Sequence, residues 1–331
     1  MAKHTVYITQ HGDKDDISVE AETLGDDVDL RLLRATDPAE IASIVQDADA
    51  LLVWRTPMPA SVIEALRRCK VIVRCGVGFD IVDIHAARES GIPVCNVPDY
   101  GTDDVADHAF GLILALRRGL LAFSDLVRGG NEGWGYEAAG RLSRLTGQTL
   151  AIVGFGRIGT AVALRAKAFG MRVVVYDPYV PRGQEKAIGV ERVWSLPDLL
   201  GQADVVSLHT PLTPETRGLA DAAFFNALKP GALVINTSRG RVLDVDALEA
   251  ALRSGRVLAA GLDVLPTEPP NPAPALLQAW RDGEEWIKHR LIVTPHAAFY
   301  NEESYREMRV KAAQTAREAL DGLPPRNCVN L

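Results

Sequence analysis

Three glycines near the middle of the chain have the spacing of a turn that binds a dinucleotide. They follow an apolar run, Thr149 to Val153, in the segment Gly154-Phe155-Gly156-Arg157-Ile158-Gly159, which opens a helix-like run. With 28 glycines in 331 residues, this spacing arises by chance about 0.2 times, so its context must decide. In such a turn the first glycine permits the bend, the second lets the backbone approach a pyrophosphate, and the third lets the helix pack closely. The helix N-terminus then faces the phosphates, and we expect this segment to bind a dinucleotide.

An acidic residue, Asp177, follows the next apolar run, Arg172 to Tyr176. A carboxylate at this place can accept hydrogen bonds from the ribose hydroxyls of adenosine, and its charge repels a 2′-phosphate. Because Pro178 comes next, Asp177 also fits a polar strand terminus without a ligand. The order of strand, glycine turn, helix and second strand favours the first interpretation and predicts NAD in preference to NADP.

Polar side chains also follow three later apolar runs, where ligands collect at the carboxyl ends of parallel strands. Each has a structural interpretation as well, as a surface arginine, a loop carboxylate, or a histidine satisfied within the protein. The segments are Asn236-Thr237-Ser238-Arg239-Gly240, Asp263-Val264-Leu265-Pro266-Thr267-Glu268-Pro269, and Thr294-Pro295-His296-Ala297-Ala298.

A second glycine turn, Arg74-Cys75-Gly76-Val77-Gly78, ends an apolar run in the first third of the chain. The backbone N–H groups of such a turn can hold a carboxylate. A simple turn with no ligand fits the same residues.

Together these segments strongly resemble those of the D-isomer-specific 2-hydroxyacid dehydrogenases, and most of all the branch that includes the C-terminal binding proteins. The resemblance covers nearly the whole chain and extends to residues 73–80, 94–98, 163–170 and 176–179. It implies an α/β fold with two doubly wound parallel-sheet domains, a flavodoxin-like substrate domain and an inserted Rossmann NAD-binding domain. It also implies hydride transfer between NAD(H) and a small D-2-hydroxy acid or 2-oxo acid.

The resemblance makes Arg239, Glu268 and His296 the catalytic residues. Arg239 would hold the substrate carboxylate and carbonyl with its planar, permanently charged fork. His296 would give a proton in reduction and take one in oxidation. Glu268 would orient the imidazole and favour its charged form. This chemistry requires no metal.

Further contacts follow from the same resemblance. Arg74, Gly76 and Val77 would bind the substrate at a cleft between the domains, with Arg74 as a second cation beside Arg239. Asp263 would lie near the nicotinamide amide. The other residues that would contact the cofactor, besides the glycine turn and Asp177, are His209, Thr210, Pro211, Thr216, Thr237, Ser238, Arg239 and His296. The remaining histidines are expected to be structural or solvated; they are His4, His11, His85, His108 and His289.

Short Val-, Ile- and Leu-rich runs alternate with amphipathic stretches, which is typical of parallel strands with crossover helices. In the first series, helices are expected near 38–47, 59–69 and 82–90, and strands at Thr5–Thr9, Asp29–Leu33, Ala50–Trp54, Val71–Arg74 and Pro93–Val97. The second series predicts six strands of a doubly wound sheet, at Thr149–Val153, Arg172–Tyr176, Val205–Leu208, Leu233–Asn236, Ala259–Val264 and Leu291–Thr294.

A chain of this length fits two domains. A long apolar helix is expected from about Thr102 to Val127, followed by a glycine-rich loop at 129–135, and residues 266–290 are expected to form a surface connection. A charged amphipathic helix from Glu302 to Leu320 should return to the first domain. We therefore expect a substrate domain at 1–100 and 296–331 and an NAD-binding domain at 101–295.

Composition narrows the function classes. No apolar stretch reaches the roughly 20 residues that cross a bilayer, and the first residues do not read as a signal peptide, so a cytoplasmic location is expected. A net charge of −7 without a Lys/Arg cluster argues against a nucleic-acid partner. No Cys-x-x-Cys spacing occurs, and reduced thiols are expected at Cys69, Cys75, Cys95 and Cys328.

The sequence also predicts an oligomeric state, and it leaves alternatives open for the activity. The apolar segment Ala106 to Leu121 is more apolar than a solvent-facing helix should be and predicts a homodimer. Besides an enzyme, the chain fits an NAD-responsive binding protein resembling the C-terminal binding protein corepressors, or a scaffold that has lost activity. The catalytic residues favour the enzyme. Phe299 stands where that branch often has Trp; Phe keeps an apolar wall but loses the indole N–H, so the substrate range of the branch is not expected to transfer. Neither the long polar tail of the animal corepressors nor the regulatory domain of some phosphoglycerate dehydrogenases is expected here.

Overall fold

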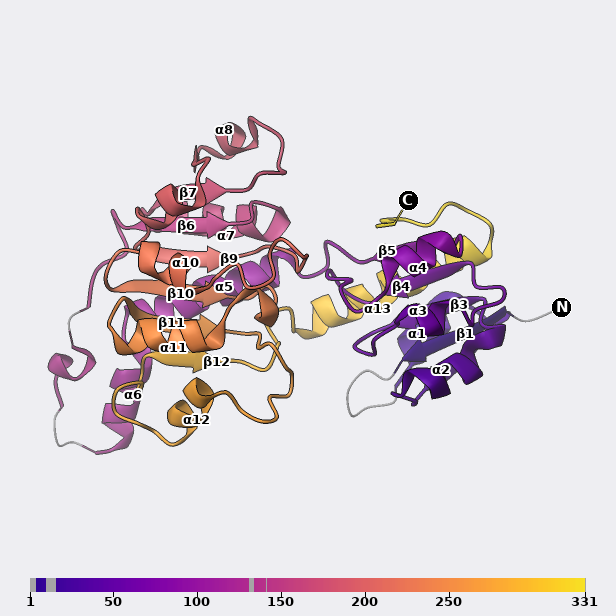
Figure 1. Ribbon diagram of the computed structural model, residues 1–331, viewed down its shortest axis with the longest axis horizontal. Helices are drawn as coiled ribbons and strands as arrows, with labels where there is room; N and C mark the ends of the chain where they lie inside the picture. Colours follow the sequence, from indigo (N-terminus) through magenta and orange to yellow (C-terminus); the bar gives the residue numbers. More distant parts are fainter. Residues whose placement is uncertain (1–3, 10–15, 131–133, 141, 331) are drawn as a thin grey trace. The chain divides into compact units, whose positions relative to one another are not determined.

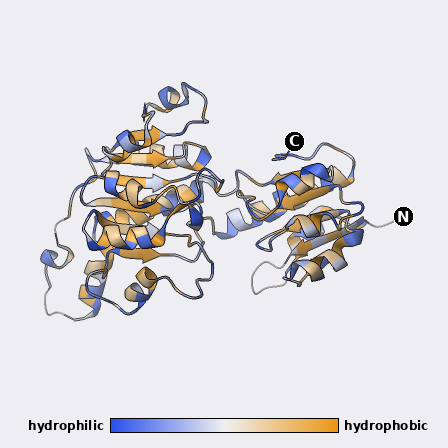
Figure 2. Cartoon of the chain, viewed as in Figure 1, coloured by the Kyte–Doolittle hydropathy of each residue, from blue (hydrophilic) through white to orange (hydrophobic). Residues whose placement is uncertain are grey.

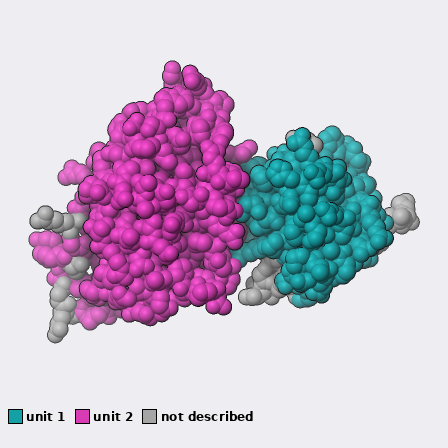
Figure 3. Space-filling view, in the orientation of Figure 1, with its two compact units in different colours: residues 1–101, 300–331 teal, residues 102–299 magenta. Residues whose placement is uncertain are grey.

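The chain forms two compact units. The computed structural model describes residues 4–9, 16–130, 134–140 and 142–330. One unit comprises Met1–Gly101 and Tyr300–Leu331, and the other comprises Thr102–Phe299 (Figure 3). The second unit is thus inserted as one continuous stretch into the first. The domain bounds expected from the sequence are 1–100 with 296–331, and 101–295.

The first unit is built on a five-stranded parallel sheet in the order β2-β1-β3-β4-β5. This is the flavodoxin-like order, and it confirms the predicted fold of this part of the chain. The strands are short, and all except the edge strand β2 are almost wholly buried because their apolar residues face helices on both sides. They are β1 (His4–Thr9), β2 (Val28–Leu33), β3 (Ala50–Val53), β4 (Val71–Arg74) and β5 (Val94–Asn96).

Helices cover both faces of this sheet. One face packs on α2 (Pro38–Ile44), α3 (Ala60–Ile63) and α4 (Ile84–Glu89). The other packs on α1 (Ser18–Leu24) and α13 (Glu302–Leu320), which contact each other (Figure 1). Within this layer Arg309 of α13 forms an ion pair with Glu20 of α1 at 2.6 Å, and the Glu20 side chain is fully buried. A short 3-10 turn, η1 (Val45–Asp47), follows α2.

The second unit is built on a seven-stranded parallel sheet in the order β12-β11-β10-β9-β6-β7-β8. Numbered from β6, this is the Rossmann order 3-2-1-4-5-6 with one further strand, and the predicted fold is confirmed. Six of the strands fall in the predicted runs, and β8 is an edge strand of two polar residues. The strands are β6 (Thr149–Val153), β7 (Arg172–Tyr176), β8 (Glu191–Arg192), β9 (Val205–Leu208), β10 (Ala232–Asn236), β11 (Val257–Leu262) and β12 (Leu291–Val293).

Two layers of helices enclose this sheet, and hydrophobic residues fill its strands (Figure 2). Alternate residues of each strand face opposite layers, as in β6, where Leu150 and Ile152 lie in one core and Ala151 and Val153 in the other. One layer holds α5 (Thr102–Arg117) and α7 (Arg157–Ala168). The other holds α9 (Leu196–Leu200), α10 (Ala222–Ala227), α11 (Val245–Arg253) and α12 (Ala275–Arg281).

The prediction of a single long helix from Thr102 to Val127 is wrong in one respect. The chain forms two helices, α5 and α6 (Leu120–Arg128), because Gly119 between them takes a left-handed φ of 62°. The 3-10 turn η2 (Tyr136–Ala139) comes after α6. Residues 131–133 of the expected glycine-rich loop, and His11, lie outside the described residues.

The expected surface connection at 266–290 contains α12, so it is partly helical. Two further short elements, α8 (Gln184–Ile188) and the 3-10 turn η3 (Gly240–Val242), follow β7 and β10. Among the described helices, none is both long enough and apolar enough to span a bilayer. The order of strands reverses between β6 and β9, and in open parallel sheets ligands bind beyond the carboxyl ends of such a strand pair.

Candidate active site

The glycine turn after β6 has the geometry that each of its glycines is expected to provide. Gly154 has a left-handed φ of 93°, and a β-carbon there would lie 2.7 Å from the backbone of His209. A β-carbon on Gly159 would lie 2.1 Å from the Gly154 carbonyl oxygen. At Gly156, by contrast, the space is open, and no side chain caps the start of α7. The first N–H groups of this helix are therefore available to an anion.

Asp177 joins the end of β7 to the glycine turn. Its carboxylate accepts the Phe155 N–H at 2.8 Å on one oxygen, and the N–H groups of Tyr179 and Val180 at 2.9 and 3.1 Å on the other. A carboxylate has about four lone-pair sites, so capacity for one more donor remains. The Phe155 side chain is fully buried in the core. Asp177 thus has a structural role in addition to any role toward a ribose.

Three buried polar atoms at the ends of β9 and β10 have no hydrogen-bond partner among the described residues. They are Thr210 Oγ1, Thr237 Oγ1 and His209 Nδ1. The other ring nitrogen of His209 lies 2.8 Å from Ser207 Oγ, and burial lowers the pKa of His209 to about 4. Buried polar atoms are nearly always paired. Unpaired atoms beside an open glycine turn fit a site that a polar cofactor completes.

Arg239 follows β10 on a turn built by a residue that the sequence analysis did not single out. The fully buried Asn236 accepts the Ser238 N–H and hydroxyl on its Oδ1, at 3.0 and 2.7 Å, and donates from Nδ2 to the Arg239 carbonyl at 3.1 Å. These bonds fix the backbone from which the guanidinium extends. The Ser238 hydroxyl, a predicted cofactor contact, is used inside this turn.

Asp263 holds the loop that carries His296. Its side chain is only 1 % exposed, and it accepts bonds from the Thr294 hydroxyl at 2.5 Å and from the N–H groups of Ala297 and Ala298 at 2.9 and 3.0 Å. These bonds hold His296 at a φ of 55°. A non-glycine residue in the left-handed region persists only where its surroundings enforce it. Asp263 was predicted from resemblance to lie near the nicotinamide amide.

A histidine set aside by the sequence analysis also belongs to this network. His108 Nε2 of α5 lies 3.0 Å from Thr294 Oγ1. Because the Thr294 hydroxyl proton is directed to Asp263, the Thr294 oxygen must accept from His108 Nε2–H. His108 is therefore a positioning residue for the loop, and no sequence pattern links residues so far apart.

His296 and Glu268 form a direct pair. Glu268 Oε2 lies 2.6 Å from His296 Nδ1, and Glu268 Oε1 accepts the Leu265 N–H at 2.8 Å. The Glu268 side chain is 33 % exposed and the His296 side chain is 29 % exposed, so the pair remains open to solvent and to a small molecule. The Glu268 carboxylate fixes which ring nitrogen faces it, and this leaves Nε2 for exchange of a proton.

The other predicted cofactor contacts are distributed around the turn. Thr216 Oγ1 donates to the Pro211 carbonyl at 2.6 Å, which closes the loop after β9. Arg157 and Ile158 begin α7, and Ile158 packs partly on the core. No group of three or more His, Cys, Asp and Glu side chains suited to a metal ion occurs within the described ranges.

The turn predicted to bind substrate belongs to the first unit, after β4. Gly76 has a φ of 136°, and its N–H donates to the Arg74 carbonyl at 2.9 Å, so this group is already used. The Arg74 guanidinium folds over Gly76, which has no side chain to obstruct it. Asn96 Nδ2 donates to the Val77 carbonyl at 2.6 Å and steadies the turn.

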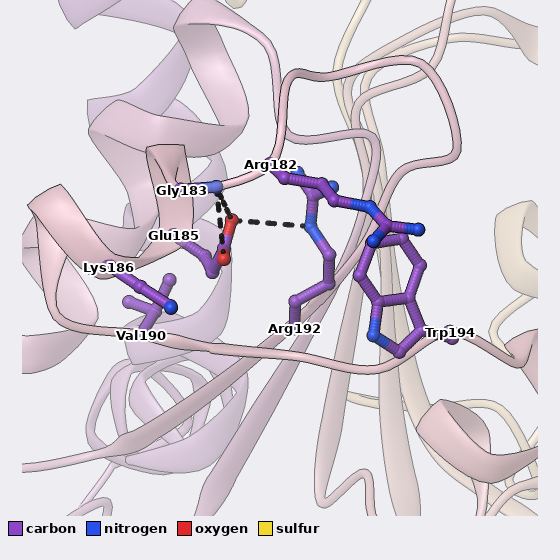
Figure 4. Close-up of a pocket in the computed structure, with 7 residues that line it drawn as sticks. All are labelled: Arg182, Gly183, Glu185, Lys186, Val190, Arg192 and Trp194. Carbon is purple, nitrogen blue, oxygen red and sulfur yellow. Dashed lines mark hydrogen bonds and ion pairs between the residues drawn. The ribbon is translucent and has the colours of Figure 1, made fainter.

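A separate cavity of about 530 Å³ is lined by residues between Arg182 and Trp194, in the segment that follows β7 (Figure 4). The ring of Trp194 faces the guanidinium groups of Arg182 and Arg192, each 5.0 Å from a ring centroid. Glu185 pairs with Arg192 at 3.4 Å. None of the residues that line this cavity is one of the predicted catalytic residues Arg239, Glu268 and His296.

Comparison with known proteins identifies the family. Residues 110–298 match the model of the D-isomer specific 2-hydroxyacid dehydrogenase NAD binding domain. The chain belongs to the D-isomer specific 2-hydroxyacid dehydrogenases. Within this family it is 37 % identical over 300 residues to a D-3-phosphoglycerate dehydrogenase of Mycobacterium leprae, an alignment that covers 90 % of this chain and 54 % of that protein. The chain therefore spans about half the length of that curated relative.

Solved structures of whole chains agree with this membership. The TT0316 protein from Thermus thermophilus is 35 % identical with a TM-score of 0.83, and the match covers 98 % of this chain and 99 % of that one. A D-lactate dehydrogenase from Aquifex aeolicus, solved with NAD and lactic acid, is 30 % identical with a TM-score of 0.82 over 96 % of both chains. Family members thus share both units of the fold with this chain.

Proposed function

We propose that the protein is an NAD-dependent oxidoreductase that transfers a hydride between NAD(H) and a small D-2-hydroxy acid or 2-oxo acid. The observation that carries the proposal is the pair of His296 Nδ1 and Glu268 Oε2 at 2.6 Å. An acid/base pair held on a φ-constrained loop, in the same unit as a Rossmann glycine turn, has a use in proton transfer and none in mere binding. The family match supports the same class of reaction.

In this proposal His296 exchanges a proton with the substrate oxygen through Nε2. Reduction of a 2-oxo acid needs a proton on the oxygen that becomes the hydroxyl, and oxidation needs a base at the same place. The Glu268 carboxylate at Nδ1 orients the ring and stabilises its charged form. Asp263, Thr294 and His108 hold the loop that carries His296 in place.

Arg239 would bind the substrate carboxylate and polarise the neighbouring carbonyl. A guanidinium can donate two parallel hydrogen bonds to a carboxylate and stays charged at every working pH. We assign the turn of Arg74, Gly76 and Val77 in the first unit to substrate binding, with the Arg74 guanidinium as its cation.

The residues that would hold the cofactor are those of the glycine turn, Asp177, and the polar atoms left unpaired at Thr210, Thr237 and His209. The nicotinamide ring supplies the hydride in reduction and accepts it in oxidation. The open space at Gly156 and the uncapped start of α7 suit the pyrophosphate. Asp177 suits the adenosine ribose and disfavours a 2′-phosphate.

We also propose a homodimer, built on the end of the expected segment Ala106 to Leu121 and on the residues after it. The apolar residues of α5 that motivated the prediction, such as Ala109 and Ile113, are buried within their own unit. The exposed large apolar side chains of this region lie on α6 and in the residues after it, namely Leu120, Leu121, Val127, Trp134, Tyr136 and Leu142. Several exposed apolar side chains close together in the sequence fit contact with a second copy of the chain.

The proposal is tested by reduction of a panel of 2-oxo acids with NADH, followed by loss of cofactor absorbance, for the wild type, His296→Ala and Glu268→Gln. His296→Ala should lower kcat by about 10² to 10⁴ while NADH still binds. Glu268→Gln should also lower kcat, because the His296 ring loses the carboxylate that orients it. A wild type that binds NADH but reduces none of the acids would instead support the NAD-responsive binding protein.

A further inference from the structure

The last described residues of the chain pair with the edge strand of the first unit. Cys328 forms an isolated antiparallel bridge with Cys95 of β5. The Val329 N–H donates to the Val94 carbonyl at 2.8 Å, and the Asn96 N–H donates to the Asn327 carbonyl at 3.3 Å. These two bonds lie on either side of the cysteine pair and do not join its own backbone groups.

This pattern places Cys95 and Cys328 at a non-hydrogen-bonded position of an antiparallel pair. The α-carbons of such a pair are about 4.5 Å apart, and their side chains leave the sheet on the same face. Disulfides span α-carbon separations of about 4.4 to 6.8 Å, so this backbone needs little movement to be cross-linked.

The two thiols differ in their access to solvent. Cys95 is fully buried, and burial, reinforced by the Cys328 thiol, raises the pKa of Cys95 to about 12. Cys328 is half-buried, and its thiol donates to Asn330 Oδ1 at 3.2 Å. A soluble oxidant therefore meets Cys328 first, and Cys95 lies behind it as the second sulfur.

We propose that Cys95 and Cys328 form a reversible disulfide in response to a hydroperoxide. In the first step the Cys328 thiol gives up its proton, its sulfur attacks one peroxide oxygen, and the O–O bond breaks. The sulfur becomes a sulfenic acid, and the hydroxide that leaves takes up the thiol proton and departs as water. In the second step the Cys95 sulfur attacks the sulfenic sulfur, the S–S bond forms, and a second water leaves. Two thiols and one hydrogen peroxide thus give one disulfide and two waters, and a dithiol reductant reverses the change.

The cross-link joins the C-terminal segment to the strand that steadies the turn at Gly76 and Val77. The Val97 N–H donates to the Gly76 carbonyl at 3.1 Å, and Asn96 Nδ2 donates to the Val77 carbonyl at 2.6 Å. A closed disulfide therefore restrains β5 from the side opposite to this turn. It also closes a very long loop of chain, which lowers the entropy of the unfolded state. This modification goes beyond the proposed function and does not depend on it.

The test oxidises the reduced, full-length protein with hydrogen peroxide, blocks the remaining thiols by alkylation, and analyses tryptic peptides by mass spectrometry. The expected product links the peptide Glu89 to Arg117 with the peptide that begins at Asn327, and dithiothreitol separates them. Oxidation should also raise the melting temperature by several degrees, since the native strands are already paired.

Two variants make the test specific. Cys328→Ser, a conservative change at a half-buried position, should abolish both the linked peptide and the rise in melting temperature. Cys69→Ser, which removes a thiol outside the pair, should retain both. A disulfide between Cys328 residues of two chains, or oxidation of Cys328 to sulfinic acid while Cys95 remains alkylatable, would overturn the proposal.

Discussion

Gly240 approaches the backbone of Leu265 so closely that a β-carbon on Gly240 would lie 1.9 Å from the Leu265 carbonyl carbon. The contact joins two loops of the candidate site, because Gly240 follows Arg239 directly and the Leu265 N–H is bonded to Glu268. Only a residue without a side chain permits this approach. The distance between Arg239 and the pair of His296 and Glu268 thus depends on the close contact between Gly240 and the Leu265 backbone.

Gly240→Ala should therefore move the loop of Leu265 and Glu268 and lower kcat by about 100-fold, since small displacements of catalytic groups cost rate at this scale. Steady-state kinetics with a 2-oxo acid measures the loss, and fluorescence titration with NADH shows whether cofactor binding survives. Gly111→Ala is the matched control, because a β-carbon there meets nothing within 4 Å. Near wild-type turnover in Gly240→Ala would show that the loops do not depend on this contact.

Arg239→Lys keeps the charge but loses the planar fork. Since the fork acts on the bound substrate and on the developing oxyanion, KM should rise and kcat should fall together, each by about tenfold or more. Kinetic constants for one good 2-oxo acid provide the measurement. A rise in KM with unchanged kcat would limit Arg239 to ground-state binding.

Asp177→Asn tests cofactor selection more sharply than removal of the side chain. The amide oxygen can still accept some of the bonds from the N–H groups of Phe155, Tyr179 and Val180, whereas the charge that repels a 2′-phosphate is gone. The ratio of kcat/KM for NADH to that for NADPH should fall by about tenfold or more. An unchanged ratio would mean that the Asp177 carboxylate serves the turn alone.

The buried His209 predicts a pH-dependent stability. Its pKa is lowered by burial from 6.5 to about 4, so between these values the unfolded state binds the proton and the folded state does not. The contribution of His209 to the free energy of unfolding is fully present above pH 6.5 and is lost as the pH falls toward 4. The loss amounts to at most about 3 kcal/mol.

Urea unfolding at pH 7 and pH 5 measures this effect. His209→Gln can still hydrogen-bond Ser207 and should reduce the difference between the two pH values. His85→Gln changes an exposed histidine and should not. Equal pH dependence in the wild type and His209→Gln would contradict the assignment.

The homodimer is tested by light scattering at micromolar concentration. The wild type should show twice the chain mass of 35.8 kDa, and Leu120→Glu with Val127→Glu should shift it toward the monomer by placing charges on the apolar surface of α6. Leu323→Glu, an exposed apolar site in the other unit, is the control. A monomeric wild type would exclude the dimer.

The fold could be predicted because its strands are uninterrupted apolar runs buried on both faces, and the glycine turn between β6 and α7 has its own spacing. The edge strand β8 was missed because Glu191 and Arg192 carry no apolar signal. The break at Gly119 was missed because the surrounding residues all favour a helix. In both places the tertiary structure overrides the preference of the local sequence, and for this reason the sequence pattern did not predict the observed structure.

Within the site, residue types were predictable but their partners were not. The Asp263 carboxylate could bind either a ligand or the protein's own N–H groups, and the sequence alone does not distinguish these two roles. His108 reaches Thr294 only because α5 packs on the sheet. The role of Asn236 in the turn before Arg239 was not identified, since a polar residue at a strand end has many uses.

The insertion of the second unit has a consequence for synthesis on the ribosome. Residues 102–299 must be made before α13 appears, and at about 5 to 20 residues per second this takes about 10 to 40 s. Throughout that time Glu20 lacks the Arg309 partner that neutralises it in the finished protein. The inserted unit, although it begins second, is therefore the first that can complete its core, and the unit begun first must wait for its last helix.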